Sequence, residues 1–532
     1  MEQLQLLADG TLIIPYGIIE LESKHLKSIN KELVKAVVIP ESVRVIQLLT
    51  FYRFTNLASV TLPNQLERIG SAAFSDCKAL TSITIPNSVK SIEARAFSST
   101  ALESITIPNS VTEFGEYVFS YCNSLTSVTL PDNMTYIPYG FFSGSPITSI
   151  NIPNSVTKIG KHAFFECPFE SITLPDSVTS IGEEAFYNCK YLSSISLPDS
   201  LTEIKNLAFR SCTNLQSINL PSRLTSIGNG AFWGCPKLTS LVIPKSVTRI
   251  GNYIFSLCDS LSEIIVEAGN PIYDSRENCN AIIKTKNNTL VAGCKTSAIP
   301  DGVKVIGKGA FGDCFGLTSI HIPDSVTKIE SGAFCNSHLT TITLPSRLKS
   351  IGAHAFEHSQ LTSINIPDTV KEIGERAFGR CFSLKSISLG KSIEYIDTRA
   401  FHYCTSLETL TISEGVKVIG YEAFCGCESL LSLTLPNSII KLDLNSFYGC
   451  QSLTTLTIPK TIKRIGEESF RSDEPSIGSS SFNSCKSLTT INYLGKKKDW
   501  KNVRNIPNWN QFVPTNVVHC LDGDVEIEPY NP

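Results

Sequence analysis

The sequence predicts a repeat solenoid whose short strands stack into a parallel sheet, and two observations indicate it. A phenylalanine recurs in 18 units at spacings of 22 or 23 residues, and the same apolar pattern surrounds it each time. The chain also has 532 residues, which is too long for one compact hydrophobic core. The marker residues are Phe51, Phe74, Phe97, Phe119, Phe142, Phe164, Phe186, Phe209, Phe232 and Phe255 and, after an interruption, Phe311, Phe334, Phe356, Phe378, Phe401, Phe424, Phe447 and Phe470.

The elements of one unit can be derived from LTSITIPNSVKSIEARAF, residues 80–97. The segment LTSITI alternates apolar and hydroxyl side chains, which predicts a half-buried strand. Pro86 ends it, because proline has no N–H for a ladder. Val89 and Ile92 then supply the apolar side chains of a return segment. The motif AFxxC is expected to form a short helical turn, and stacked units bury a continuous core.

Many units place a glycine directly after the isoleucine of the return segment. We expect a sharp bend with a positive φ there, which glycine adopts without steric cost. The position holds Gly70, Gly160, Gly182, Gly228, Gly251, Gly307, Gly352, Gly374, Gly420 and Gly466.

The pattern LxxIxIPxSVxxIGxxAFxxCxxL, over residues 40–492, resembles the BspA-like leucine-rich repeats of bacterial surface proteins and some parasitic protists. Taken with the unit pattern, the resemblance implies a leucine-rich-repeat horseshoe, α/β but strand-dominated. Its parallel β-sheet would lie on the concave face, with short strands and helical turns on the convex side. The segment GNPIYDSRENCNAIIKTKNNTLVAGCKTSAIP resembles an insert seen in that family, and INYLGKKKDWKNVRNIPNWN resembles its terminal cap.

These features divide the chain into consecutive parts. We expect an N-terminal cap over 1–39, a first repeat array over 40–261, a β-hairpin insert over 262–300, a second array over 301–492 with an extra loop at 471–481, and a C-terminal cap and tail over 493–532.

Thirteen of the 18 cysteines occupy one slot, three residues after a marker phenylalanine or the equivalent Phe482. Because Ser and Thr take that slot in other units, we expect a small side chain in a tight turn and free, buried thiols. An odd number also excludes complete pairing within the slot. Cys279 and Cys294 flank a predicted hairpin, and a disulfide between them stays open at this point.

The composition and motifs do not favour catalysis. A net charge of -3 argues against nucleic-acid binding, and no run of 18 apolar residues predicts a membrane span. No phosphate-binding, zinc-protease or serine-hydrolase motif occurs. His354 and His358 are four residues apart, but we interpret them as exposed turn residues rather than zinc ligands. We therefore expect no enzyme, no cofactor, no metal site and no catalytic residues.

The residues that flank the middle isoleucine of LxxIxI are expected to face solvent, where they form a surface of hydroxyls. Short hydroxyl side chains suit a soluble sheet, and they also permit many weak contacts with a partner. The candidate contact residues are Thr84, Thr106, Thr129, Thr173, Thr343, Thr411, Thr434 and Thr457.

The hydroxyl pattern breaks beside the insert, at Val242 and at Glu263 and Ile265. With Tyr273 and Arg276 nearby in the insert, this patch is the preferred candidate for a specific contact, since loops on rigid solenoids often bind. The alternative is an inert spacer. In either case, replacing residues 270–296 by a short linker is expected to leave a folded solenoid.

The sequence thus predicts a non-catalytic protein-binding scaffold. The family resemblance implies an adhesin-like protein at the cell surface or secreted, whose ligand is a protein or a glycan-bearing protein. Neither a signal peptide nor an anchor is visible, so a cytoplasmic structural or regulatory scaffold is the alternative. We expect a monomer that neither binds nucleic acid nor inserts into a membrane.

Overall fold

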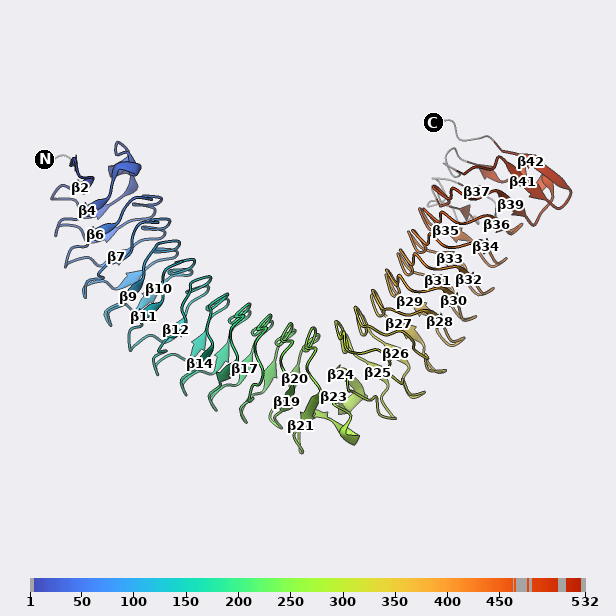
Figure 1. Ribbon diagram of the computed structural model, residues 1–532, viewed down its shortest axis with the longest axis horizontal. Helices are drawn as coiled ribbons and strands as arrows, with labels where there is room; N and C mark the ends of the chain where they lie inside the picture. The colour runs from blue at the N-terminus through green and yellow to red at the C-terminus, as the bar shows by residue number, and fades with distance from the viewer. Residues whose placement is uncertain (1–3, 463, 466–475, 478–480, 506–512, 528–532) are drawn as a thin grey trace. The chain divides into compact units, whose positions relative to one another are not determined.

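The computed structural model describes residues 4–462, 464–465, 476–477, 481–505 and 513–527. This part of the chain is a strand-dominated parallel β-solenoid of stacked coils with almost no helix (Figure 1). It divides into two compact units, which are described separately. Unit 1 comprises Met1–Ile254 and Val266–Pro271, and unit 2 comprises Phe255–Ile265 and Ile272–Pro532.

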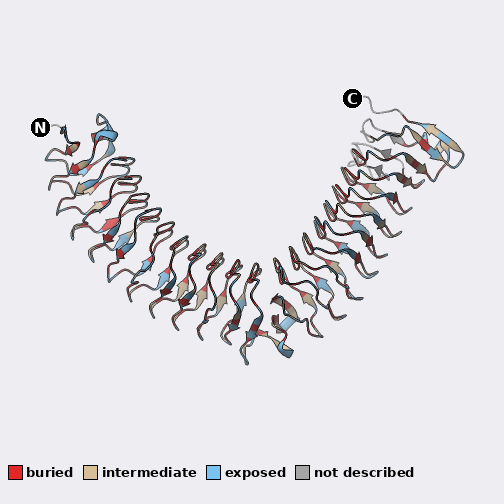
Figure 2. Cartoon of the chain, in the orientation of Figure 1, coloured by how far each residue is buried: buried red, intermediate tan, exposed pale blue. Residues whose placement is uncertain are grey.

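The LxxIxI segments form the first ladder of short strands. In β9 (Ser104–Thr106) the central isoleucine is buried and its two neighbours are exposed, which is the expected alternation (Figure 2). The other strands at this position are β2 (Thr11–Ile13), β4 (Ala36–Val38), β6 (Ser59–Thr61), β11 (Ser127–Thr129), β14 (Ser171–Thr173), β16 (Ser194–Ser196), β19 (Ser240–Ile243), β21 (Glu263–Val266), β28 (Ser363–Asn365), β30 (Ser386–Ser388), β32 (Thr409–Thr411), β34 (Ser432–Thr434), β36 (Thr455–Ile458) and β39 (Thr490–Tyr493).

A second parallel ladder is formed by two residues at the end of each return segment. The sequence analysis predicted short strands on this side of the coil, but not that they pair with one another into a ladder. In unit 1 its strands are β3 (Glu20–Leu21), β5 (Val45–Ile46), β7 (Arg68–Ile69), β8 (Ser91–Ile92), β10 (Glu113–Phe114), β12 (Tyr136–Ile137), β13 (Lys158–Ile159), β15 (Ser180–Ile181), β17 (Glu203–Ile204), β18 (Ser226–Ile227) and β20 (Arg249–Ile250). They form one sheet of five strands and one of six.

In unit 2 the second ladder belongs to a single sheet of 13 strands. Its members are β22 (Tyr273–Asp274), β23 (Ala281–Lys284), β24 (Thr289–Gly293), β25 (Val305–Ile306), β26 (Lys328–Ile329), β27 (Ser350–Ile351), β29 (Glu372–Ile373), β31 (Tyr395–Ile396), β33 (Val418–Ile419), β35 (Lys441–Leu442), β37 (Arg464–Ile465), β38 (Ser476–Ile477) and β40 (Arg504–Asn505). The second ladder is thus the more continuous of the two.

The glycine after each return segment has a different role from the one predicted. Gly70, Gly160 and Gly182 are not among the glycines with positive φ. A Cβ on Gly160 would lie 2.5 Å from the carbonyl oxygen of Ile137 in the preceding coil. The expectation of a positive-φ bend was therefore wrong at these positions. Glycine is present because neighbouring coils approach closely there. Gly466 lies outside the described residues.

The AFxxC segment is a tight turn rather than the expected helical turn. The residues two before and two after the marker phenylalanine adopt positive φ; Glu184 has φ 53° and Asn188 has φ 62° around Phe186. This conformation costs about 1–2 kcal/mol for a residue with a side chain. The amides of Glu184, Phe186 and Asn188 donate to carbonyl oxygens of the next coil at 3.0, 2.9 and 2.8 Å. These bonds offset the cost and satisfy the buried backbone.

The marker phenylalanines stack on one another along each unit, as the repeat predicts. The rings of Phe186 and Phe209 have centroids 5.4 Å apart and planes 5° apart, and those of Phe378 and Phe401 are 5.2 Å and 1° apart. All four side chains are fully buried. Phe470 and most of the expected extra loop at 471–481 lie outside the described residues.

The cysteine slot is defined by a hydrogen bond as well as by size. The thiol of Cys212 donates to the carbonyl oxygen of Phe186 at 3.2 Å, and that of Cys404 donates to Phe378 at 3.3 Å. In another coil the hydroxyl of Ser145 donates to the carbonyl oxygen of Phe119 at 2.6 Å. Cys and Ser can share the slot because both are small donors, although the buried hydroxyl of Ser337 has no hydrogen-bond partner among the described residues. All 18 cysteines are free thiols, including Cys279 and Cys294.

Hairpins and short helical turns close the ends of the units. At the N-terminus β1 (Gln5–Leu6) pairs antiparallel with β2, followed by the 3-10 turns Ser23–Leu26 and Lys31–Leu33. At the C-terminus α1 (Lys497–Trp500) precedes β41 (Val517–Cys520) and its antiparallel partner β42 (Gly523–Glu526). Trp500 packs at 5.1 Å against the buried ring of Tyr493.

The insert forms the first layer of unit 2. Strands β22, β23 and β24 are antiparallel, with the 3-10 turns Arg276–Asn278 and Thr285–Asn287 between them. β24 then pairs in parallel with β25, so that Leu290 lies opposite Ile306. Ile283 and Leu290 belong to the same buried cluster as the repeats that follow. The insert is thus part of the solenoid core rather than a loop attached to it.

Candidate functional site: the hydroxyl surface and its hollow

The solvent-facing positions of the first ladder form columns of hydroxyl side chains. Thr106 lies opposite Thr129, and in unit 2 Ser363, Ser386 and Thr409 lie in one column. The predicted exposure is confirmed for Thr84, Thr106, Thr129, Thr173, Thr343, Thr411 and Thr434, whereas Thr457 is half-buried. Their role in binding stays a prediction. We call these positions the hydroxyl surface.

The hydroxyl groups of this surface recognise a partner by uncharged hydrogen bonds. A Ser or Thr hydroxyl both donates and accepts, so it can meet either kind of polar group. One such bond contributes only about 0.5–1.5 kcal/mol net. Useful affinity therefore needs several contacts at once, and an array in register can supply them.

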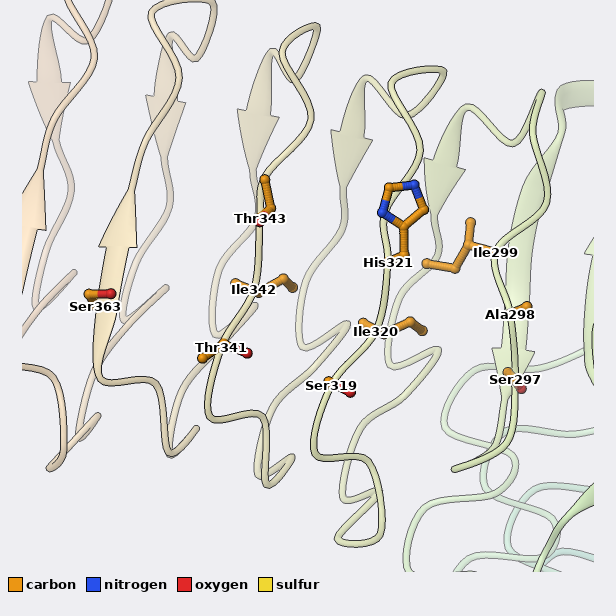
Figure 3. A pocket seen from close by; sticks show the side chains of 10 residues that line it. All are labelled: Ser297, Ala298, Ile299, Ser319, Ile320, His321, Thr341, Ile342, Thr343 and Ser363. Carbon is orange, nitrogen blue, oxygen red and sulfur yellow. The ribbon is translucent and has the colours of Figure 1, made fainter.

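A hollow lies on the hydroxyl surface of unit 2, where the first ladder is open. Residues 297–299, 319–321 and 341–343 are not paired as strands in three consecutive coils, and the ladder resumes at β28. The hollow has a volume of about 700 Å³ and is lined by residues of these segments (Figure 3). It is built entirely within unit 2.

The hollow combines apolar and polar lining groups. Ile320 and Ile342 are half-exposed here, whereas the equivalent Ile364 of the next coil is buried. Ser319, His321 and Thr341 are exposed beside them (Figure 3). Apolar area with a few hydroxyls and one imidazole suits a contact with a neutral side chain or main chain. No carboxylate, lysine or arginine lines it.

The structure divides the predicted patch beside the insert into exposed and engaged residues. Val242 is 45% exposed and Ile265 is 41% exposed, and Glu263 is also exposed. These three side chains are available to a partner. Tyr273 is only 4% exposed, so its ring cannot provide a direct contact.

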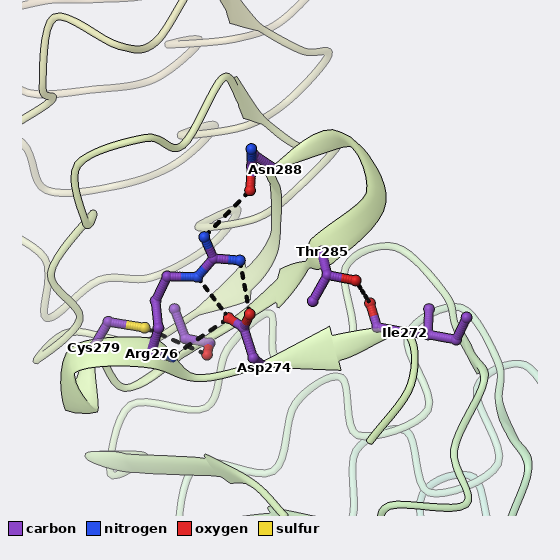
Figure 4. A network of polar contacts seen from close by, with 7 residues as sticks. Ile272, Asp274, Arg276, Cys279, Thr285 and Asn288 are labelled. Carbon is purple, nitrogen blue, oxygen red and sulfur yellow. Dashed lines mark hydrogen bonds and ion pairs between the residues drawn. The ribbon is translucent and has the colours of Figure 1, made fainter. Parts of the chain in front are cut away.

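Arg276 holds the insert together instead of presenting a free cation. Its guanidinium donates to both carboxylate oxygens of Asp274, at 2.9 and 2.7 Å, and to the side-chain oxygen of Asn288 at 3.2 Å (Figure 4). The hydrogen bonds that Arg276 donates to the Asp274 carboxylate raise the pKa of Arg276. Since Asn288 turns the hairpin with φ 50°, this contact fixes the hairpin turn.

His354 and His358 sit in a turn that separates their side chains. Both have positive φ, 57° and 58°, on either side of Phe356. His354 pairs with Glu357 at 2.6 Å, and His358 accepts from Arg380 at 3.4 Å. Among the described residues, no group of three or more His, Cys, Asp or Glu could hold a metal ion.

One exposed feature of unit 1 was missed in the sequence. The position two residues before the cysteine slot holds Phe165, Tyr187, Arg210 and Trp233 in four consecutive coils. Their side chains contact one another in that order, at 5.1, 5.1 and 5.0 Å. Aligning the units on their marker phenylalanines would have shown this column.

The repeat pattern identifies the family. The model of the BspA type leucine rich repeat region, with six copies, matches residues 44–168, 157–279, 291–408 and 396–493. The chain belongs to the BspA-type leucine-rich repeat family. A search of curated proteins finds no significant match. No described helix is long and apolar enough to cross a membrane.

Solved structures of bacterial repeat proteins share low similarity with the chain. A leucine-rich repeat protein from Bacteroides ovatus is 21% identical, with 98% of this chain and 99% of that chain covered and a TM-score of 0.30. A leucine rich cell surface protein from Faecalibacterium prausnitzii is 23% identical, with 94% and 95% covered and a TM-score of 0.28. With TM-scores this low, the family assignment depends on the repeat model alone.

Proposed function

We propose that the protein is a non-catalytic scaffold that binds other proteins, in the manner of an adhesin, at the cell surface or after secretion. The observation that carries this proposal is the hydroxyl surface. Its side chains repeat in register from coil to coil, so that exposed Thr and Ser hydroxyls form columns along the sheet.

The architecture supports binding rather than chemistry. The thiols and phenylalanines that recur from coil to coil are buried in the core. The residues that differ between coils lie mainly at exposed positions. Members of such repeat families act as rigid supports for extended binding surfaces. The resemblance of the repeats to bacterial surface proteins supports an extracellular address.

The contact is expected at the hollow, because there the hydroxyl surface also offers apolar area. Burial of apolar surface contributes about 25 cal/mol per Å². The partly exposed Ile320 and Ile342 can therefore add affinity that hydroxyls alone cannot provide.

A photo-crosslinking experiment on native cells tests the proposal. A benzophenone amino acid replaces Thr343, at the rim of the hollow, or Lys371, an exposed residue of the second-ladder segment of unit 2. We expect light-dependent protein adducts from the Thr343 variant and none of the same mass from the Lys371 variant. Surface proteolysis of the same cells should remove the protein.

Two results would count against the proposal. Absence of adducts from Thr343 and from equivalent positions Thr411 and Thr434 would exclude the hydroxyl surface as the binding face. Protection from protease on intact cells, with cleavage after lysis, would place the scaffold inside the cell.

A further inference from the structure

The column of Phe165, Tyr187, Arg210 and Trp233 in unit 1, here called the Arg210 column, has the composition of a binding hot spot. Trp, Tyr and Arg are the residue types that dominate the energetics of protein interfaces. All four side chains are half-buried, with part of each open to solvent. They lie on the turn that follows the marker phenylalanine, whereas the hydroxyl surface belongs to the strand segments of the first ladder.

Arg210 lies between two aromatic rings. Its guanidinium carbon is 5.1 Å from the ring centroid of Tyr187 and 5.0 Å from that of Trp233. Stacking on both faces restricts the guanidinium, so less conformational entropy is lost when its N–H groups bind a ligand. The ring of Trp233 also stacks on that of Tyr253, with centroids 6.1 Å apart and planes 20° apart.

No carboxylate of the described residues pairs with Arg210. Arg95, whose guanidinium carbon lies 5.4 Å from the ring centroid of Tyr117, also has no carboxylate partner among the described residues, whereas Arg399 has one. Arg399 stacks on Tyr421 at 5.4 Å in unit 2, but its Nε also donates to Glu422 at 2.7 Å. Arg210 thus stacks on two rings and Arg399 on one, and of these two arginines only Arg399 carries its own counter-ion.

The nearby carboxylates have partners of their own. Glu184 pairs with His162, and Glu166 accepts from the side chain of Asn188 at 2.8 Å. Lys190, three residues after Tyr187, is exposed and has no carboxylate partner among the described residues. Arg210 and Lys190 therefore keep N–H donors that no described carboxylate occupies.

The orientation of the rings restricts what can bind. Phe165 meets Tyr187 edge to face, with planes 71° apart, and the guanidinium occupies the faces of Tyr187 and Trp233. Few ring faces remain for a nucleobase or a sugar to stack on. Ring edges and guanidinium N–H groups remain, and these suit apolar side chains next to a carboxylate.

We propose that the Arg210 column is a docking site for an acidic, extended segment of a partner protein. A carboxylate of the segment accepts two parallel hydrogen bonds from Arg210, which is the geometry that guanidinium and carboxylate favour. Apolar side chains beside it cover the exposed edges of the rings. The proposal rests on the proposed scaffold function and adds a second surface with a partner of defined chemistry.

Synthetic peptides provide the probe. An array holds short peptides of apolar and acidic residues, and each has a twin in which every Asp and Glu is replaced by Asn and Gln. The full chain is applied to the array. Binding is then measured in solution through the fluorescence of Trp233, which is the only tryptophan before residue 500. The W233F variant supplies the background from the two others.

We expect acidic peptides to bind at least tenfold more tightly than their amide twins, which corresponds to about 1.4 kcal/mol. The R210A variant should lose at least tenfold in affinity, whereas the matched R399A variant should bind as the native chain does. Added salt should weaken the binding, because the contact lies at the surface. Thermal unfolding of both variants checks that they remain folded.

Three outcomes would overturn the proposal. They are equal binding of acidic and amide peptides, an R210A variant that binds as well as the native chain, and binding to anionic phospholipid vesicles without binding to the peptides. None of them affects crosslinking from Thr343, so failure of this inference is distinguishable from failure of the scaffold function.

Discussion

The thiol of Cys189 donates a hydrogen bond to the carbonyl oxygen of Phe164 in the preceding coil, with 3.1 Å between sulfur and oxygen. The same contact joins Cys235 to Phe209 and Cys381 to Phe356. It ties the cysteine slot of one coil to the aromatic stack of the coil before it. A sequence motif of 23 residues therefore encodes a contact between neighbouring repeats.

Replacing Cys189 should separate the effect of size from that of hydrogen bonding. The C189S variant keeps a donor, so we expect only a small loss of stability. The C189A variant removes one of the two hydrogen bonds that the carbonyl oxygen of Phe164 accepts, since the amide of Cys167 also donates to it at 3.1 Å. We expect a loss of about 0.5–1.5 kcal/mol. Urea unfolding of both variants measures the difference. Equal stability of the two variants would mean that the slot selects for volume alone.

The state of the thiols can be counted directly. Alkylation in denaturant without reductant should label all 18 cysteines, because none is paired in the structure. In the folded protein, Cys314, Cys335 and Cys520 should react first, since the other cysteines are buried. Mass spectrometry of the labelled peptides reads out both experiments. Pairs of unlabelled cysteines in denaturant would reveal disulfides that contradict the structure.

Alkaline pH should destabilise the fold through the same residues. Burial raises the pKa of the Cys122 thiol to about 11 and that of the Cys77 thiol to about 12, from the ordinary value of 9.0 for a cysteine. Above pH 9 the unfolded chain releases protons that the folded chain retains, so unfolding becomes more favourable. The contribution of these protonated thiols to the free energy of unfolding is therefore fully present below pH 9. It is lost as the pH rises towards 11–12.

Each such thiol changes the unfolding free energy by up to about 1.4 kcal/mol per pH unit in that window. Urea unfolding between pH 8 and pH 10.5 measures the slope. The C122S variant, whose hydroxyl does not titrate, should show a smaller decrease than the native chain. If the free energy of unfolding of the C122S variant falls with pH as steeply as that of the native chain, Cys122 does not contribute to the alkaline destabilisation.

The stacked phenylalanines should be essential to their own coils. Phe209 lies between Phe186 and Phe232, at 5.4 and 5.8 Å. Truncation to alanine leaves a cavity and costs about 3–5 kcal/mol. The matched control is F382A, because Phe382 is 51% exposed and outside the stack. Protease sensitivity around residue 209 should rise in F209A and stay unchanged in F382A; no change in either would refute the assignment.

The repeat, its core and its exposed face could be predicted from the sequence because they follow from local alternation. LTSITI alternates over six residues, and the side chains of Ile83 and Ile85 are buried as that alternation requires. The short strands of the return side were predicted in general, but their positions and their pairing into a second ladder could not be, since two residues such as Ser180–Ile181 are too short to give a strand pattern. Its strands exist only because neighbouring coils place them side by side.

The reason for the glycines and the position of the candidate sites also depended on contacts between coils. Nothing in one repeat shows that the backbone of Ile137 approaches Gly160. Likewise, Tyr273 follows a break in the hydroxyl pattern, and only the structure shows that its ring is buried. The stacking of Arg210 between residues 23 positions away on either side was visible in principle, once the repeats are aligned.

Deleting the insert should destabilise unit 2, contrary to the expectation from sequence. The amide of Gly307 donates to the carbonyl oxygen of Leu290 at 2.8 Å, and that of Gly293 donates to Ala310 at 2.9 Å. A Cβ on Gly293 would lie 2.3 Å from the ring of Phe311, so the insert covers that phenylalanine directly. Replacing residues 270–296 by a linker exposes the side chains of Phe311 and Ile306, and the exposure of each costs about 1.5–3 kcal/mol of stability.

Hydrogen exchange at the Gly307 amide should accelerate in this deletion variant, and the loss of protection from exchange should spread into the next coils. The R276A variant is the control, because it breaks a partly exposed ion pair worth at most about 1 kcal/mol. Native protection at Gly307 in the deletion variant would show that the insert is a spacer after all.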